Sequence, residues 1–277
     1  MSSSSNNASR ASVIQMVSGL DLQDNLQVAR QQMEQAKEQG ALLAVLPENF
    51  AVFGSRQLQT AGEAELNALG PIRSWMSQQA KELGLWVVGG TVPCVENVNN
   101  PERVRATCFV YDDQGKQAAR YDKIHLFDVD VTDAYGSYRE SDNFEAGKEL
   151  VLVDTPIGKL GLTTCYDLRF AEMYLALAEQ GAQVISNGAA FTKTTGEAHW
   201  QVLLRARAIE TQCYILASAQ GGTHGKRETY GHSVIIDPWG TVLEELELGA
   251  GCISADIDLA HLQQLRQRMP VASHRRL

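Results

Sequence analysis

The stretch KLGLTTCYDLRFAEMYLALAEQGAQVISN, residues 159–187, carries the pattern that decides the fold class. An apolar run leads to Cys165, a helical pattern follows over FAEMYLALAEQG, and a second apolar run, AQVISN, ends the stretch. Short apolar runs bounded by turns predict buried strands, and a helix between two such strands predicts a parallel pair covered by that helix. The stretch therefore predicts a strand–helix–strand unit whose helix N-terminus points at Cys165.

The same alternation of strand and helix patterns continues on both sides of this unit. On the N-terminal side we predict a strand over 11–17, a helix from Leu22 to about Gly40, a strand over 41–46, a helix from about Glu63 to Leu83 and a strand over 85–90. On the C-terminal side we predict a helix over about 197–212 and a strand over 213–219.

Two hairpin signals interrupt the alternation. Residues 103–122 form two alternating runs around DDQG, and residues 233–246 form two more around Pro-Trp-Gly. The Asp, Gly and Pro residues supply the turn chemistry that hairpins need. A further strand over 251–257 and a helix near 258–268 complete the predicted elements.

The combined pattern predicts an α/β fold. Alternating elements place helices on the outer face of a sheet, and the hairpins add antiparallel strands. We expect a four-layer αββα sandwich of two mixed sheets with helices outside, while a single doubly wound sheet stays open as an alternative. Because no linker interrupts the chain, we expect one domain over residues 11–277, preceded by a disordered polar tail over 1–10.

Composition narrows the range of partners. The chain has 277 residues, of which 44% are hydrophobic and 21% charged, as is typical of a globular protein. The formal net charge of −9 argues against nucleic acid and membrane surfaces as partners, because both attract clustered Lys and Arg. No apolar run approaches the length of about 18 residues that spans a membrane, and the N-terminus lacks the apolar core of a signal peptide. We therefore expect a cytoplasmic protein that acts on small molecules.

The cysteines do not form a recognisable framework. There are five, an odd number at wide spacings and without a CxxC pair, which argues against a set of disulfides or a zinc ribbon. HExxH is absent, as are the nucleotide-binding patterns GxGxxG and GxxxxGK[ST]. The five are Cys94, Cys108, Cys165, Cys213 and Cys252.

Cys165 has two interpretations. Its place between a strand and a helix is typical of an exposed nucleophile, and a helix N-terminus aimed at a thiol lowers the thiol pKa. Free cysteines are also among the most buried residue types, so Cys165 could be a small hydrophobe at the end of a strand. A cysteine nucleophile needs a base, and none of the six histidines lies in a papain-like signature, so the base should be another residue.

Two charged residues stand in otherwise apolar contexts. Glu48 follows a buried strand in AVLPENF, which brings a carboxylate to the carboxyl edge of the sheet, where open α/β folds bind ligands. Lys123 lies in ARYDKIHLFD and could supply a fixed positive charge for an oxyanion. The alternatives are a solvated loop carboxylate and a strand-edge lysine that deters aggregation. Together with Cys165, however, the two residues would make a base, an oxyanion partner and a nucleophile.

The three motifs LPENF, RYDKIHLFD and GLTTCYDLRF, in this order and spacing, resemble the Glu-Lys-Cys triad of the nitrilase (carbon–nitrogen hydrolase) superfamily. The resemblance covers nearly the whole chain after the tail. Within the superfamily, residues 194–242 and 265–276 resemble the deaminated glutathione amidase branch, whose relatives are fused to a nucleotide hydrolase in some animals.

The resemblance implies a fold and a mechanism. Relatives have an αββα sandwich that forms a homodimer or higher homo-oligomer, and they hydrolyse amide C–N bonds without a metal or organic cofactor. By this resemblance Cys165 attacks the amide carbonyl, Glu48 transfers protons, and Lys123 stabilises the oxyanion together with the Tyr166 backbone N–H. Glu140 matches an additional glutamate that orients the lysine or the water, or else it is an exposed loop carboxylate.

The resemblance also implies a substrate, deaminated glutathione, which would yield 2-oxoglutarate and cysteinylglycine. Arg169 is expected to bind a substrate carboxylate or to form an internal ion pair, and Phe191 and Thr192 are expected to line the pocket. The loop 128–140 departs from relatives that have Pro-Gly after FDV, which puts the role of its glutamate in doubt. The basic loop HGKRE, residues 224–228, is a substrate lid or a solvated turn, and we favour the turn.

Two other functions use the same residues differently. An ω-amidase that acts on 2-oxoglutaramate would need the same triad and would release a smaller leaving group. A binding protein on an inactive nitrilase scaffold would have no need of Cys165. The preference between two amide substrates separates the first alternative, and the effect of Cys165→Ala separates the second.

Overall fold

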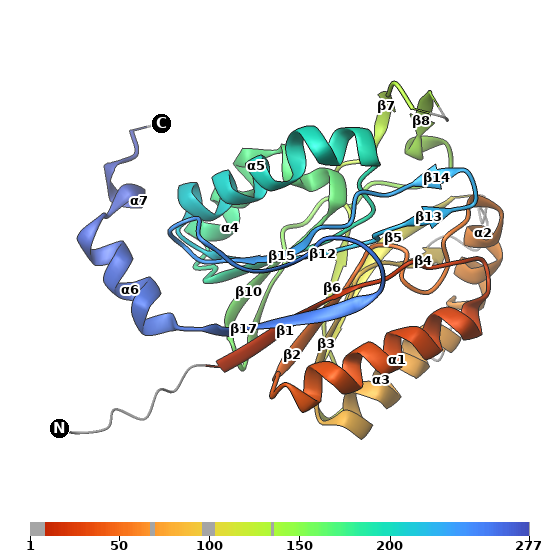
Figure 1. Cartoon of the computed structure of the whole chain (residues 1–277), viewed down its shortest axis with the longest axis horizontal. Coiled ribbons are helices and arrows are strands. Elements are labelled where there is room, and N and C mark those ends of the chain that lie inside the picture. Colours follow the sequence, from red (N-terminus) through yellow and green to blue (C-terminus); the bar gives the residue numbers. More distant parts are fainter. Residues whose placement is uncertain (1–8, 67–69, 96–102, 134–135, 277) are drawn as a thin grey trace.

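The computed structural model describes residues 9–66, 70–95, 103–133 and 136–276. Two large β-sheets pack face to face and helices cover their outer faces, so the four-layer αββα prediction is confirmed (Figure 1). The first sheet has the order β17-β1-β2-β3-β5-β4, with β6 paired to β5. Its strands are β1 Ser9–Gln15, β2 Leu43–Leu46, β3 Trp86–Gly89, β4 Val92–Val95, β5 Val104–Tyr111, β6 Gln117–Asp122 and β17 Gly251–Ile257.

The second sheet has the order β16-β15-β12-β11-β10-β9. Both sheets are mixed: β1, β2 and β3 are parallel, as are β10, β11 and β12, while strands nearer the edges pair antiparallel. The hairpins predicted around DDQG and Pro-Trp-Gly are β5–β6 and β15–β16. The strands of this sheet are β9 Leu152–Thr155, β10 Gly158–Thr164, β11 Val184–Ala189, β12 Tyr214–Ala219, β15 Ser233–Ile236 and β16 Val242–Leu246.

The outer layers are helical. In Figure 1, α1 (Leu22–Glu38) and α3 (Pro71–Leu83) cover the first sheet, and α4 (Ala171–Glu179) and α5 (Lys193–Thr211) cover the second. Within the described ranges, no helix combines the length and the apolar character needed to cross a membrane. The remaining helices are α2 (Ser55–Ala64), α6 (Leu259–Arg268) and α7 (Val271–His274).

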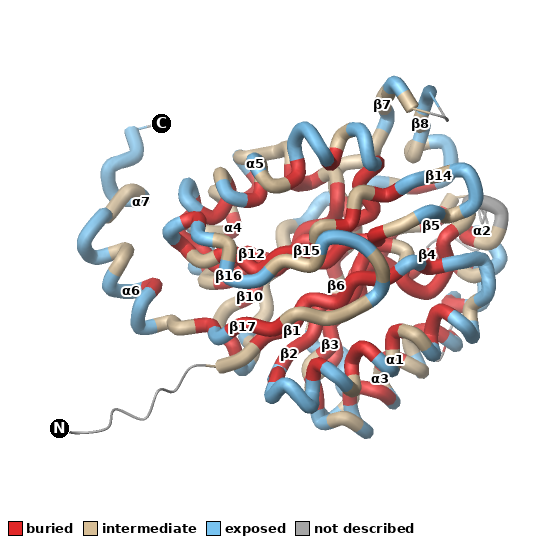
Figure 2. The backbone as a smooth tube through the Cα atoms, viewed as in Figure 1, coloured by how far each residue is buried: buried red, intermediate tan, exposed pale blue. Residues whose placement is uncertain are grey.

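Two layers of apolar side chains hold the sandwich together. Val13, Val45 and Leu162 belong to the core that includes the space between the sheets, whereas Met33 and Phe109 belong to the core beneath α1 and α3. Because both faces of each sheet are covered, the central strands are buried along their whole length (Figure 2). This burial explains why the central strands are continuous apolar runs in the sequence rather than alternating ones.

Two expectations about local structure were wrong. Instead of one helix from about Glu63 to Leu83, the structure has α2, which ends at Ala64, and α3, which begins at Pro71, a residue without a backbone N–H with which to continue a helix. The helix predicted over FAEMYLALAEQG is confirmed as α4, and a 3-10 helix, η2 (Cys165–Arg169), precedes it. Residues 1–8 of the predicted tail lie outside the described residues, but Ser9 and Arg10 are part of β1 and pair with β17.

Candidate active site

The three residues of the predicted triad stand just beyond the ends of strands. Glu48 follows β2, Lys123 follows β6, and Cys165 follows β10. Glu48 and Lys123 therefore come from the first sheet and Cys165 from the second. All three are nearly inaccessible to solvent, with exposed fractions of 5%, 1% and 7% respectively. The packing of the two sheets is thus what brings the three motifs together.

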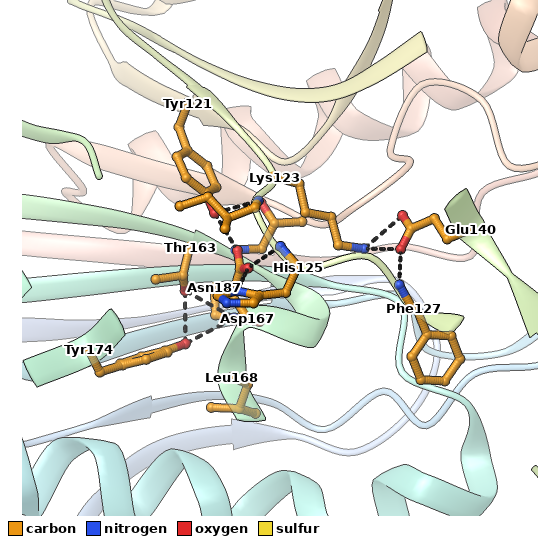
Figure 3. Close-up of polar contacts among 12 residues, drawn as sticks. Tyr121, Lys123, His125, Phe127, Glu140, Thr163, Asp167, Leu168, Tyr174 and Asn187 are labelled. Atoms are coloured by element: carbon orange, nitrogen blue, oxygen red, sulfur yellow. Dashed lines mark hydrogen bonds and ion pairs between the residues drawn. The ribbon is translucent and has the colours of Figure 1, made fainter. Parts of the chain in front are cut away.

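Lys123 lies between two carboxylates. Its Nζ atom donates to Glu48 Oε1 at 2.9 Å. It also donates to both carboxylate oxygens of Glu140 at 2.8 Å (Figure 3). Burial alone would lower the pKa of Lys123, but the negative charges of Glu140 and Glu48 outweigh it and raise the pKa well above its ordinary value. Lys123 is therefore a charged ammonium held in a fixed position.

Glu140 reaches this position through a small hairpin. Strands β7 (Asp128–Asp130) and β8 (Ser137–Arg139) form the hairpin, and Glu140 begins the 3-10 helix that follows it. The Phe127 N–H donates to Glu140 Oε2 at 2.6 Å, which fixes the carboxylate a second time (Figure 3). Burial raises the pKa of Glu140, although nearby Lys123 opposes the shift. Glu140 is not the exposed loop carboxylate that the sequence left open as an alternative.

Cys165 has a strained backbone and a thiol of high pKa. Its φ of 47° lies in the left-handed region, which a side chain with a β-carbon rarely adopts. Burial raises the thiol pKa well above its ordinary value, and the charge of Glu48 raises it further. The expectation that a helix N-terminus lowers this pKa was wrong, because α4 begins only at Ala171 and desolvation dominates. Cys165 is therefore a neutral thiol, next to the Glu48 carboxylate and the Ala190 N–H.

A second buried carboxylate lies beside this group. Asp167 Oδ2 accepts from the Tyr121 hydroxyl at 2.5 Å and from the Thr164 N–H at 2.8 Å. Asp167 Oδ1 accepts from the His125 backbone N–H at 3.1 Å and lies 2.7 Å from His125 Nδ1 (Figure 3). These bonds join the segment that carries Lys123 to the turn that carries the nucleophile.

A cavity of about 540 Å³ opens onto these groups. It has the size of a pocket for a small ligand. Both Phe191 and Thr192 line it, as expected, and so does Tyr166, whose N–H lies in the first turn of η2, where backbone donors have no partner within the helix. Glu48, Lys123, Glu140 and Cys165 line it as well.

Arg169 lies elsewhere. It is not among the lining residues, its guanidinium stacks over Tyr166 and Phe191 at 5.7 and 5.3 Å from the ring centroids, and its Nη1 is 3.2 Å from His199 Nδ1. The structure therefore places Arg169 beside two residues of the cavity wall, where it supports aromatic rings, and not inside the cavity as predicted. No carboxylate of the described residues pairs with it either.

Several lining residues were not predicted from the sequence. Asn49, Phe53 and Tyr138 line the cavity, together with His224 and Arg227 from the basic loop. That loop is a short hairpin of β13 (Thr223–His224) and β14 (Arg227–Glu228), so the preference for a solvated turn was wrong for its Arg. The only signal in the sequence was the local cluster of basic residues, which does not reveal the direction of a side chain.

The described residues contain no group of three or more His, Cys, Asp or Glu side chains placed to hold a metal ion. The chemistry available here comes from the side chains. A buried thiol, a carboxylate that accepts its proton and a fixed ammonium together suit attack on a polarised carbonyl.

Comparisons with known proteins agree with this geometry. The carbon–nitrogen hydrolase family matches residues 10–267. A deaminated glutathione amidase of Yersinia enterocolitica is 42% identical over 265 residues, which cover 95% of this chain and 92% of the relative. The crystal structure of the NitFhit protein of Caenorhabditis elegans is 37% identical with a TM-score of 0.90, and the match covers 97% of this chain and 65% of that one.

A further solved structure bears on the cysteine. A mutant of the amidase from Nesterenkonia sp. AN1, with acrylamide added at its active-site cysteine, is 28% identical to this chain with a TM-score of 0.78. The match covers 95% of this chain and 98% of the amidase. Family, relatives and solved structures thus agree with each other over nearly the full length, and the chain belongs to the carbon–nitrogen hydrolase family.

Proposed function

We propose that this protein is an amidase that hydrolyses deaminated glutathione through a thioester on Cys165. The observation that carries the proposal is the joint position of Glu48, Lys123 and Cys165 on one cavity, with Lys123 Nζ at 2.9 Å from Glu48. The relative from Yersinia enterocolitica, named a deaminated glutathione amidase, supports the choice of substrate at 42% identity.

The first half of the reaction forms the thioester. Because the thiol pKa is raised, Cys165 needs a base as it attacks the amide carbonyl, and Glu48 accepts the proton. The negative charge that develops on the carbonyl oxygen is stabilised by the Lys123 ammonium and the Tyr166 N–H. Glu48 then gives the proton to the leaving nitrogen, the C–N bond breaks, and cysteinylglycine departs as an amine.

The second half releases the acid. Glu48 removes a proton from water, which attacks the thioester carbonyl, and the proton returns to the sulfur of Cys165 as the C–S bond breaks. The products are 2-oxoglutarate and the free thiol. Glu140 acts as a positioning residue, since it holds the Lys123 ammonium through both carboxylate oxygens at 2.8 Å.

Steady-state kinetics on two substrates test this proposal. We expect kcat/KM for deaminated glutathione to exceed that for 2-oxoglutaramate at least about tenfold, measured as release of 2-oxoglutarate. Equal or reversed preference would favour the ω-amidase alternative. Cys165→Ala should abolish both activities, and an unchanged activity would overturn the mechanism. A wild-type protein that binds the amide without hydrolysing it would support the inactive scaffold instead.

We also propose a homodimer that acts in the cytoplasm. Val202 and Ile209 lie seven positions apart on α5 and are 70% and 44% exposed, and Ile209 lies against Gly240, beside Trp239, which is 60% exposed. An exposed apolar group of this kind is typical of an interaction surface. Sedimentation of the wild-type protein and of Val202→Glu measures the assembly, and a wild-type monomer would contradict the dimer.

The proposed cytoplasmic location is supported by the cysteines. All five are free thiols, as suits a reducing compartment.

A further inference from the structure

Arg227 is the arginine that the structure brings into the cavity. It lies in β14, and the β13–β14 hairpin stands at the same end of the molecule as β7 and β8 (Figure 1). Its Nη2 atom donates to the Ala190 carbonyl at 2.8 Å, and the N–H of the same residue faces the sulfur of Cys165. A single residue just beyond β11, Ala190, therefore separates the guanidinium from Cys165.

The guanidinium keeps unused hydrogen-bonding capacity. It stacks over the rings of Phe53 and Tyr138, at 5.0 and 5.5 Å from their centroids. Its Nε atom is buried and has no hydrogen-bond partner, and no carboxylate of the described residues forms an ion pair with it. Arg139, by contrast, also lines the cavity but binds Asp130 at 2.8 Å. Because Arg227 lines the cavity and has no carboxylate partner among the described residues, its guanidinium can bind a ligand there, and a carboxylate matches its geometry.

The hairpin holds Arg227 in place from both sides. The His224 ring stacks on Phe53 with centroids 3.9 Å apart. Burial lowers the pKa of His224, so its neutral ring donates through Nδ1 to the Ser18 carbonyl at 2.7 Å and accepts at Nε2 from the Thr229 hydroxyl at 2.8 Å. The position of Arg227 is thus fixed before any substrate binds, which reduces the cost of ordering it.

A second hollow of about 390 Å³ adjoins the cavity, and the two share Tyr138 and Arg227. Besides Arg227, the second hollow is lined by two cations, Lys193 and Lys226, and by two carboxylates, Asp133 and Glu228. Lys193 lies 3.6 Å from Glu228. Arg227 therefore stands at the boundary between the two hollows.

We infer that Arg227 binds the terminal carboxylate of the leaving group, so that it selects amides of short peptides over primary amides. The inference rests on the proposed function and adds the subsite for the departing half of the substrate. The acyl half stays on Cys165 after the first step, whereas the departing half must leave the cavity, and Arg227 lies where the cavity adjoins the second hollow. A leaving group without a carboxylate makes no use of Arg227.

A thermodynamic cycle that combines one change in the enzyme with one change in the substrate tests this inference directly. One change is Arg227→Gln, and the other replaces the terminal carboxylate of deaminated glutathione with a carboxamide. Since a hydrogen-bonded charge pair contributes about 1.5–3 kcal/mol, each single change should lower kcat/KM about 10- to 150-fold, mainly through KM. The two changes together should cost no more than either alone, and Arg227→Lys should restore part of the loss.

Two controls separate the outcomes. The rate on 2-oxoglutaramate, whose leaving group is ammonia, should stay within about twofold in Arg227→Gln. Arg139→Gln removes the other cavity arginine, and its preference for carboxylate over carboxamide should match that of the wild-type enzyme. An equal loss on 2-oxoglutaramate, or additive losses in the cycle, would overturn the inference while the amidase activity stands. A wild-type enzyme inactive on deaminated glutathione would overturn the proposed function and this inference with it.

Discussion

Two clusters around largely buried carboxylates lie close together in this protein, and they differ in what surrounds the carboxylates; Figure 3 shows Lys123 with Glu140 and, beside them, Asp167 with its partners. The lysine cluster consists of Glu48, Lys123 and Glu140, in which one ammonium serves two carboxylates. The aspartate cluster consists of Asp167 with Tyr121, His125 and the Thr164 N–H, in which several donors serve one carboxylate.

The two clusters differ in whether their carboxylates have lone pairs left to accept further hydrogen bonds. In the lysine cluster negative charge exceeds positive charge, and the groups line the cavity. In the aspartate cluster Asp167 is fully buried, both of its oxygens accept hydrogen bonds, and it does not line the cavity. A carboxylate that exchanges protons needs an unused lone pair. A carboxylate that positions the backbone is most stable when all of its lone pairs accept hydrogen bonds. We therefore expect changes in the first cluster to reduce turnover and changes in the second to reduce stability.

The largest loss of turnover should follow Glu48→Gln. The amide cannot accept the proton of the Cys165 thiol, and a general base contributes about 10²- to 10⁴-fold, so we expect kcat to fall about 10³-fold. Removal of the Glu48 charge should also lower the thiol pKa, because that charge helps to raise it. The pH dependence of alkylation by iodoacetamide measures this shift. A variant that keeps a tenth of wild-type turnover would exclude Glu48 as the base.

Lys123→Met should cause the second-largest loss of turnover. Loss of one oxyanion donor costs about 10²- to 10³-fold in kcat. The variant also leaves Glu48 and Glu140 buried without a counter-charge, which costs about 3–5 kcal/mol of unfolding free energy.

The stability of Lys123→Met should depend on pH in a specific direction. Buried carboxylates without a partner have raised folded-state pKa values, so their protonated forms stabilise the fold at low pH and the effect is lost as pH rises through those values. Urea unfolding at pH 5 and pH 8 should therefore find the variant closer to wild type at pH 5. The opposite order would contradict the pairing of Lys123 with both carboxylates.

Glu140→Gln should have an intermediate effect. Because Glu140 holds the Lys123 ammonium through both carboxylate oxygens, we expect kcat to fall about 10- to 100-fold with little change in KM. Burial raises the pKa of Glu140 in the wild-type protein, so its carboxylate is protonated as pH falls through the raised value and Lys123 loses one partner. This contribution to the acid limb of the kcat profile should be absent from the variant. Identical acid limbs in both proteins would show that Glu140 has no influence on the lysine.

Asp167→Asn should give the smallest loss of turnover. The amide cannot accept from all the donors that Asp167 serves, and an unsatisfied buried group costs about 1–3 kcal/mol, which thermal unfolding would measure. We expect kcat to change less than about tenfold. Tyr121→Phe is the matched control, since it removes only one of the donors and should be milder. A loss of turnover as large as that of Glu48→Gln would remove the distinction between the two clusters.

The sequence predicted the triad because its residues stand at strand ends. Apolar runs identify β2 and β10, and Glu48 and Cys165 stand just beyond their carboxyl ends, where such sheets place ligands. That the two strands belong to different sheets, packed face to face, was not visible in the motifs. The role of Glu140 was less predictable, because its position depends on the β7–β8 hairpin, which was not among the elements predicted from the sequence.

The sequence failed where side-chain direction decides the outcome. Arg169 is one turn past the nucleophile but stacks on Phe191 at 5.3 Å, whereas Arg227 is far away in sequence and lines the cavity. The sequence around either arginine does not show where its side chain points, because the long flexible side chain leaves its direction to the packing of neighbouring elements. The pKa of Cys165 was mistaken for a related reason, since burial between two sheets is not visible in a local motif.

The most direct measurement of the central claim is mass spectrometry of the intact wild-type protein, acid-quenched during turnover of deaminated glutathione. The proposed mechanism predicts one added 2-oxoglutaryl group, mapped by fragmentation to Cys165 and absent from Cys165→Ala. The other cysteines, for example Cys213 beneath the second sheet, serve as internal controls and should stay unmodified. Turnover in which Cys165 never carries the acyl group would contradict the proposed mechanism.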